Sequence, residues 1–211
     1  GKYPAVLLFC GHEAEAKASV SYQKTATLFV QHGFVVMMID PISQGERYQL
    51  TDKAGKPLTR GGTTEHTLLN EASNLFGNST PKDELWDNIR GLDYLVTRKE
   101  VDTERIGCLG NSGGGMQTIY FVGFDDRIKI AAPCSYVSSR ERTLELSGTA
   151  DGCAQMPNEG KMQLEFSDYL MAMAPKPLLL LAGKYDFIDY EGVLQAHSDL
   201  VKAYNLLHQQ N

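Results

Sequence analysis

A serine set among glycines is the clearest candidate for chemistry in this sequence. Residues 110–114 read Gly-Asn-Ser-Gly-Gly, which places Ser112 in the pattern G-x-S-x-G. An apolar stretch precedes the pattern and a helical pattern follows it, so the motif falls at a strand-to-helix turn. A turn of this kind exposes the serine hydroxyl above the sheet and directs the N–H of Gly113 toward a developing oxyanion. The motif predicts a nucleophilic serine in an elbow completed by Gly110, Asn111 and Gly114.

Other glycine-rich turns fit these residues less well. A dinucleotide-binding turn needs G-x-G-x-x-G, and Ser112 occupies the place of the middle glycine. A P-loop needs G-K-[ST], and no lysine follows the glycines. A turn with a purely structural role stays open as an alternative, because glycines are common turn formers.

A carboxylate downstream can supply the acid of a catalytic triad. Asp186 is the first acidic residue after the apolar stretch at 176–182. The chain order Ser…Asp suits α/β-hydrolases, whose histidine comes last. Catalytic loops of open α/β sheets follow the carboxyl ends of the strands, and this favours Asp186 over Asp189. Asp189 precedes the last helical pattern and fits the N-cap of that helix better.

The loop after the first apolar stretch, with the sequence FCGHEAEA, is the candidate for the second oxyanion donor. In hydrolases of this kind, that donor is a backbone N–H from the corresponding loop. His12 is well placed to donate through its main chain. Its side chain is expected to line a pocket rather than to act as the base.

Apolar stretches alternate with helical patterns along the whole chain. Such alternation predicts an α/β fold with a mostly parallel sheet covered by helices on both faces. Thr80 is expected as an N-cap, followed by Pro81 at the first helical position. The expected strands are 4–10, 34–39, 105–109, 128–134 and 176–182; the expected helices are 20–32, 64–76, 81–96, 114–122, 138–146, 162–173 and 190–208.

Several segments, in order, resemble one known group. HGFVVMMIDPISQGER, WDNIRGLDYLVTRKEVDTERIGCLGNSGGG, FDDRIKIAAPCSYVSS and MAPKPLLLLAGKYDFID are similar to bacterial acetyl xylan esterases of the dienelactone hydrolase type. The resemblance implies a three-layer α/β-hydrolase and an esterase acting on acetylated carbohydrate such as xylan. It implies Ser112 as nucleophile, Asp186 as acid, and the N–H groups of His12 and Gly113 as the oxyanion hole. It further implies no cofactor and no metal. Many relatives carry a histidine where Cys10 stands.

The base of this group is a histidine that follows one more strand after the acid. After Asp186 the sequence reads as a single helix, and His197 and His208 fall within its amphipathic pattern. Neither His32 nor His66 is favoured as the base. The catalytic histidine is therefore expected beyond residue 211, and this chain by itself is expected to be nearly inactive. We expect residues 1–211 to form one hydrolase domain lacking its first strands and its last strand, with a lid or pocket segment at 135–175.

Composition limits the range of partners. The net charge of −6 and the absence of a lysine or arginine run argue against nucleic acid, and the apolar stretches are too short to span a membrane. The four cysteines (Cys10, Cys108, Cys134, Cys153) show no disulfide or metal-binding spacing, and the first three lie in strand-like stretches as small buried hydrophobes.

An ester substrate is expected, and exposed sheet edges allow a homo-oligomer. A periplasmic or secreted location is plausible for the full-length protein, although the chain opens on no signal peptide.

Two further functions compete with an esterase. A peptidase of the prolyl-oligopeptidase type shares the serine elbow and the acid, but normally carries a propeller domain upstream. A non-catalytic scaffold would keep the glycine turn for structural reasons only. A nucleotide-binding domain is a more distant alternative, which would be stabilised by NAD or ATP.

Overall fold

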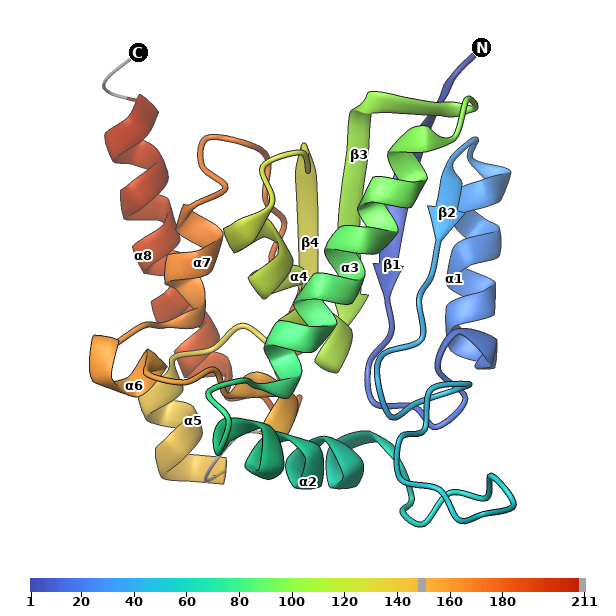
Figure 1. The fold of residues 1–211 in the computed structure, drawn as a ribbon. Coiled ribbons are helices and arrows are strands. Elements are labelled where there is room, and N and C mark those ends of the chain that lie inside the picture. Colours follow the sequence, from blue (N-terminus) through green and yellow to red (C-terminus); the bar gives the residue numbers. More distant parts are fainter. Residues whose placement is uncertain (148–150, 209–211) are drawn as a thin grey trace.

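The computed structural model describes residues 1–147 and 151–208 and is built around a parallel sheet (Figure 1). Its strands are β1 (Tyr3–Phe9), β2 (Val35–Met37), β3 (Val101–Asn111) and β4 (Ile130–Cys134). They lie in the order β2-β1-β3-β4, and all neighbours are parallel. The predicted α/β class is confirmed.

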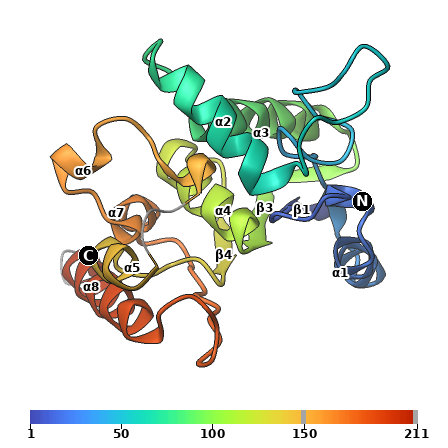
Figure 2. The same cartoon turned by 90° about the horizontal axis from the view of Figure 1, so that it is seen from below.

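The alternation of side chains along β1 explains why helices cover both faces of the sheet. Leu7 and Phe9 face a core cluster shared with α3 (Thr80–Thr97) and α4 (Gly113–Phe124), whereas Val6 and Leu8 face a second cluster shared with α1 (Val20–Gln31). Figure 2 shows α1 and α3 on opposite sides of β1. Burial of each such leucine contributes about 1.5–3 kcal/mol, so both helix layers are held by apolar burial.

The carboxyl ends of the strands carry most of the remaining structure. The helices α2 (Gly62–Asn74), α5 (Arg140–Ser147) and α6 (Glu159–Met162) lie at this end, at the bottom of Figure 1. The N-terminus and the carboxyl end of α8 lie at the opposite end. The other elements are α7 (Phe166–Met171), α8 (Tyr190–His208) and the 3-10 turns η1 (Ala16–Ala18) and η2 (Gly152–Ala154).

The structure differs from the sequence prediction at the start of α3 and within the helix expected over 162–173. The N-cap of α3 is Ser79 rather than Thr80, and the N–H of Thr80, the first residue of the helix, donates to Asn70 Oδ1 of the neighbouring helix α2 at 3.0 Å. The helix expected over 162–173 is split into α6 and α7. Gln163 ends α6 in the left-handed region at φ 55°, and Glu165 then caps α7 through a reciprocal hydrogen-bonded box.

The apolar segment 176–182 is not the regular fifth strand that its composition predicts. It runs parallel to β4 but joins it at two isolated bridges, Ala131↔Leu178 and Cys134↔Leu181. Pro177 lacks an N–H and can only accept, taking a hydrogen bond from Ala131 at 3.3 Å. The segment forms the edge of the sheet beside β4, and Leu179 is 55% exposed.

Other expectations concern the cysteines, the membrane and the segment 135–175. All four cysteines are free thiols, as predicted.

Within the described residues, no helix is both long enough and apolar enough to traverse a bilayer. Segment 135–175 holds α5, η2, α6 and α7, although its residues 148–150 lie outside the described ones. A lid role for this segment stays a prediction.

Candidate active site

The turn between β3 and α4 has the shape of a nucleophile elbow. Ser112 lies between the last residue of β3 and the first residue of α4, with φ 56° and ψ −122°. This backbone conformation is strained for a residue with a side chain, and such strain concentrates at functional turns. The N–H of Ser112 donates to the carbonyl of Cys134 at 2.9 Å, which ties the elbow to the end of β4.

Close approach of the backbones explains the glycines at both ends of the elbow. A β-carbon built at Gly110 would lie 2.4 Å from the carbonyl oxygen of Gly114, and one built at Gly114 would lie 2.2 Å from the carbonyl oxygen of Phe9. Any side chain at either position would collide with backbone. The expectation of small residues two places before and two places after the serine is therefore met for a steric reason.

The loop after β1 lies directly beside the elbow. Phe9 at the end of β1 pairs with Gly110 in the sheet, so Gly11 and His12 continue past the serine turn. Within the described residues, the backbone N–H groups of His12 and Gly113 donate to no protein acceptor. Two unsatisfied donors flanking Ser112 are the arrangement that an oxyanion hole requires.

A buried glutamine holds the loop after β1 in place. The Nε2 group of Gln44 donates to the carbonyl of Gly11 at 2.7 Å and to the carbonyl of Glu13 at 2.7 Å. These two bonds bracket His12 and fix the course of its backbone. The sequence gives no sign of this role, because Gln44 lies in a polar stretch far from the loop in the chain.

The two carboxylates near residue 186 have different partners. Asp189 accepts a hydrogen bond from the N–H of Gly192 at 2.7 Å, where α8 begins, and it forms an ion pair with the guanidinium of Arg142. Asp186 lies in the turn after the edge segment, half-buried, and accepts the N–H of Phe187 at 2.7 Å. It forms no ion pair with any described residue. Asp186 is thus the carboxylate left available to orient a histidine.

Among the described side chains, no imidazole forms a hydrogen bond with Ser112 Oγ, although the His12 ring packs against Gly113, the next residue in the chain. His32 caps the end of α1, and His197 is exposed on α8. The Nε2 atom of His12 faces His66 and Cys153. The side chain of His208 lies outside the described part of the structure.

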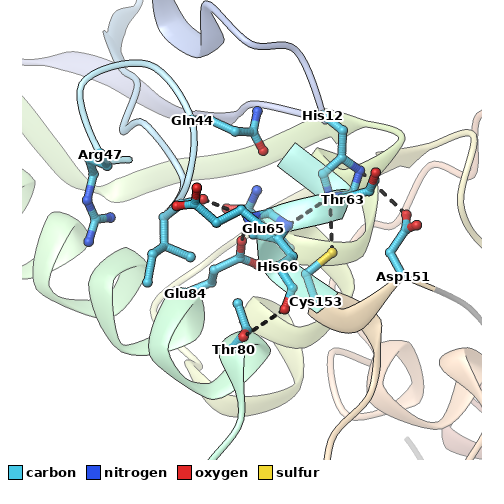
Figure 3. A network of polar contacts seen from close by, with 12 residues as sticks. His12, Gln44, Arg47, Thr63, Glu65, His66, Thr80, Glu84, Asp151 and Cys153 are labelled. Atoms are coloured by element: carbon cyan, nitrogen blue, oxygen red, sulfur yellow. Dashed lines mark hydrogen bonds and ion pairs between the residues drawn. The ribbon is translucent and has the colours of Figure 1, made fainter. Parts of the chain in front are cut away.

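A polar network fills the space behind the loop that carries His12 (Figure 3). His12 Nε2 lies 3.2 Å from His66 Nδ1 and 3.0 Å from Cys153 Sγ, while His12 Nδ1 faces Asp151 Oδ2 at 3.6 Å. Burial lowers the pKa of His12 and of His66 to about 4, so both imidazoles are neutral at neutral pH. The sequence gives no sign that His66 and Cys153 act together, because they are 87 positions apart and only the fold brings them together.

Comparison with known proteins places the chain in a family. Residues 1–158 match the model of the acetyl xylan esterase (AXE1) family. The chain is 30% identical over 126 residues to the candidate hydrolase YtaP of Bacillus subtilis (strain 168), a match that covers 57% of this chain and 41% of YtaP. Because the family model spans well over half of the residues, the chain belongs to the acetyl xylan esterase family.

Solved structures show the same fold. A candidate acetyl xylan esterase from Bacteroides fragilis superposes with a TM-score of 0.78 at 18% identity, covering 99% of this chain and 57% of that protein. The acylaminoacyl peptidase of Pyrococcus horikoshii superposes with a TM-score of 0.65 at 18% identity, covering 97% of this chain and 31% of the peptidase. These likenesses establish the α/β-hydrolase fold. The chain spans about half the length of the relatives that it matches.

Proposed function

We propose that this chain is the core of a serine esterase that hydrolyses ester-linked acyl groups, with acetylated carbohydrate as its substrate class. The observation that carries the proposal is the strained Ser112 elbow, flanked by the unsatisfied N–H groups of His12 and Gly113. Membership of the acetyl xylan esterase family supports the choice of substrate.

In the proposed reaction, the hydroxyl of Ser112 attacks the acyl carbon and gives its proton to the base, which returns that proton to the oxygen of the departing alcohol. The N–H groups of His12 and Gly113 stabilise the negative charge on the tetrahedral intermediate. Each such donor is worth roughly 10²–10³ in kcat, because it acts on charge that develops only in the transition state. Water then hydrolyses the acyl-enzyme and releases the acid.

The proposed base is a histidine outside the described residues, oriented by Asp186. Asp186 supports this assignment because its carboxylate has no cationic partner among the described residues, whereas Asp189 is committed to Arg142 and to α8. A serine hydrolase without its base keeps only roughly 10³–10⁴-fold catalysis over water. We accordingly propose that full activity requires a histidine that the described residues do not place in hydrogen-bonding contact with the serine.

A peptidase is the second candidate, because an acylaminoacyl peptidase shares the fold. The family match favours the esterase, and low-identity likeness of fold leaves the chemistry undecided. The two candidates predict different products: acetate from acetylated xylan for the esterase, and a released arylamine from an N-acylaminoacyl p-nitroanilide for the peptidase.

Labelling of the intact protein with a fluorophosphonate tests the proposal. We expect one adduct at Ser112, found by peptide mass spectrometry, and none in Ser112→Ala. Hydrolysis of p-nitrophenyl acetate should fall by at least about 10³-fold in Ser112→Ala. No adduct and no hydrolysis would favour a non-catalytic scaffold, and faster cleavage of the anilide than of acetylated xylan would favour the peptidase. The expected homo-oligomer and the compartment stay predictions.

A further inference from the structure

Three side chains of metal-binding type converge behind the His12 loop. His12 Nε2, His66 Nδ1 and Cys153 Sγ lie within 4.8 Å of one another. They come from three separate parts of the chain: the loop after β1, helix α2 and the 3-10 turn η2 (Figure 3). His66 and Cys153 are buried, and the side chain of His12 is 14% exposed.

The polar neighbours of the two histidines favour tautomers whose lone pairs point at each other. His66 Nε2 lies 2.6 Å from the carbonyl oxygen of Ile42, which can only accept, so the proton of this ring is on Nε2 and the lone pair is on Nδ1. His12 Nδ1 faces the carboxylate of Asp151, which favours the proton on Nδ1 and the lone pair on Nε2. Two acceptors therefore stand 3.2 Å apart, and the thiol of Cys153 supplies one proton for both.

A cation would satisfy all three atoms at once. Neutral imidazole and thiolate are the preferred ligands of Zn²⁺, and a ligating histidine usually donates its other N–H to a carbonyl or a carboxylate. Acceptors for these other N–H groups are present here: the Ile42 carbonyl lies 2.6 Å from His66 Nε2, and the Asp151 carboxylate faces His12 Nδ1 at 3.6 Å. Tetrahedral Zn²⁺ with bonds of about 2.0–2.3 Å separates its ligand atoms by about 3.3–3.6 Å. The two separations from His12 Nε2, 3.2 and 3.0 Å, need to widen by a few tenths of an ångström, and all three ligand atoms already lie within 4.8 Å of one another.

We propose that His12, His66 and Cys153 bind Zn²⁺, with Asp151 as the outer-shell partner of His12. Binding ionises the Cys153 thiol and releases its proton to solvent. The three ligands leave one coordination position for water. This site departs from the expectation, drawn from the family resemblance, that no metal is bound.

The metal would anchor the oxyanion loop, a consequence that rests on the proposed esterase function. It would tie the loop after β1 to α2 and to η2, three elements that meet beside the elbow. The His12 ring packs against Gly113, so fixing that ring also fixes the neighbouring backbone N–H of His12. His12 and its two co-ligands are positioning residues here, and the metal takes no step in the ester chemistry.

Metal analysis of the intact protein tests the site independently of catalysis. After loading with Zn²⁺ and dialysis, we expect one zinc per chain in the wild type and in Ser112→Ala. We expect none in Cys153→Ser or His66→Asn. Cys134→Ser and His197→Asn are matched controls that should keep the zinc, because Cys134 is a half-buried thiol and His197 an exposed imidazole, both outside the cluster. With free Zn²⁺ at roughly 100 times its Kd, Tm should rise by about 5–10 °C.

Substitution with Co²⁺ gives a second readout, which reports directly whether a thiolate binds the metal in the wild type. The wild type should show a thiolate-to-cobalt charge-transfer band in the near ultraviolet, and Cys134→Ser should keep it. No band in the wild type, or a band that survives in folded Cys153→Ser, would overturn the site in favour of a hydrogen-bonded cluster alone. If the metal binds but Ser112→Ala hydrolyses esters like the wild type, the esterase proposal fails while the site stands.

Discussion

The imidazole of His12 lies against the α-carbon of Gly113. A β-carbon built at Gly113 would lie 2.8 Å from His12 Cε1 and 3.0 Å from His12 Nδ1. The two residues that carry the proposed oxyanion donors are therefore in direct contact, although 101 positions separate them in the chain. The position of one donor depends on the packing of the other.

We expect Gly113→Ala to lower kcat for p-nitrophenyl acetate by about 10²-fold, the cost of a misplacement of about 1 Å in an active site. The backbone N–H of residue 113 is kept, but the new methyl group must displace the His12 ring. Steady-state kinetics measures the effect. Gly160→Ala is the control, since no atom lies within 4 Å of a β-carbon built there. An unchanged kcat in folded Gly113→Ala would show that the His12 loop does not contribute to catalysis.

Substitutions of the two aspartates after the edge segment should have different effects, on catalysis at Asp186 and on stability at Asp189. Asp186→Asn is expected to reduce kcat by about 10⁴-fold with little change in Tm, because a neutral amide cannot stabilise the imidazolium formed by a triad histidine. Kinetics and thermal unfolding are measured on the same samples.

Asp189→Asn serves as the matched variant. It removes an ion pair with Arg142 and weakens the cap of α8, so it should lower Tm with only a small effect on kcat. Because Arg142 is partly exposed, its ion pair should contribute little, and most of the fall in Tm should come from the weakened cap. If Asp189→Asn instead lost kcat and Asp186→Asn did not, Asp189 would be the acid of the triad.

Local signals in the sequence were enough for the elbow and its surroundings. The apolar stretch before Ser112, the glycines and the helical pattern after it act over a few residues, and the structure has the same strand, turn and helix there. The alternation of Leu7 and Leu8 between two cores likewise follows from the period of a strand.

Features that depend on distant contacts were not predictable in this way. Thr80 has good N-cap chemistry, but α3 begins one residue earlier than predicted, with Ser79 as its N-cap and the N–H of Thr80 donated to Asn70 from another helix. The meeting of His12, His66 and Cys153 leaves no spacing pattern, because each lies on a different element. The same holds for Gln44, whose partners lie more than 30 positions away.

Gln44 offers a test of the loop that avoids both the proposed metal ligands and the elbow. Gln44→Leu leaves the carbonyls of Gly11 and Glu13 without their donor, and each loss costs about 1–3 kcal/mol where it is buried. We expect kcat to fall with little change in KM, because an oxyanion donor acts in the transition state.

Gln23→Leu is the control for this prediction. Gln23 also donates to a backbone carbonyl, that of Lys17 at 2.7 Å, but does so at an exposed position on α1. A rise in KM at constant kcat in Gln44→Leu would place the glutamine in substrate binding instead of loop positioning.

Asp40 should make the fold sensitive to acid. Its carboxylate is buried and accepts hydrogen bonds from the ammonium of Lys17, from the N–H of Lys17 at 3.0 Å and from the N–H of Glu46 at 3.2 Å. Burial by itself raises the pKa of Asp40, but these hydrogen bonds outweigh burial and hold the pKa below its ordinary value. These hydrogen bonds connect the segment after β2 to η1, the 3-10 turn that precedes α1.

The sign of the pH dependence follows from this lowered pKa. Unfolding returns Asp40 to a pKa of about 3.9, so its contribution to stability is complete above pH ~4 and is lost as pH falls through the lower folded value. We expect the free energy of unfolding of Asp40→Asn to be about 1–3 kcal/mol lower than that of the wild type at pH 7. Urea unfolding should show this difference becoming smaller below pH ~4. Asp199→Asn, which breaks only an exposed pair with Lys202, should change stability by less than about 1 kcal/mol. A difference in free energy of unfolding that stays constant down to acid pH would mean that the ionised carboxylate of Asp40 does not stabilise this part of the fold.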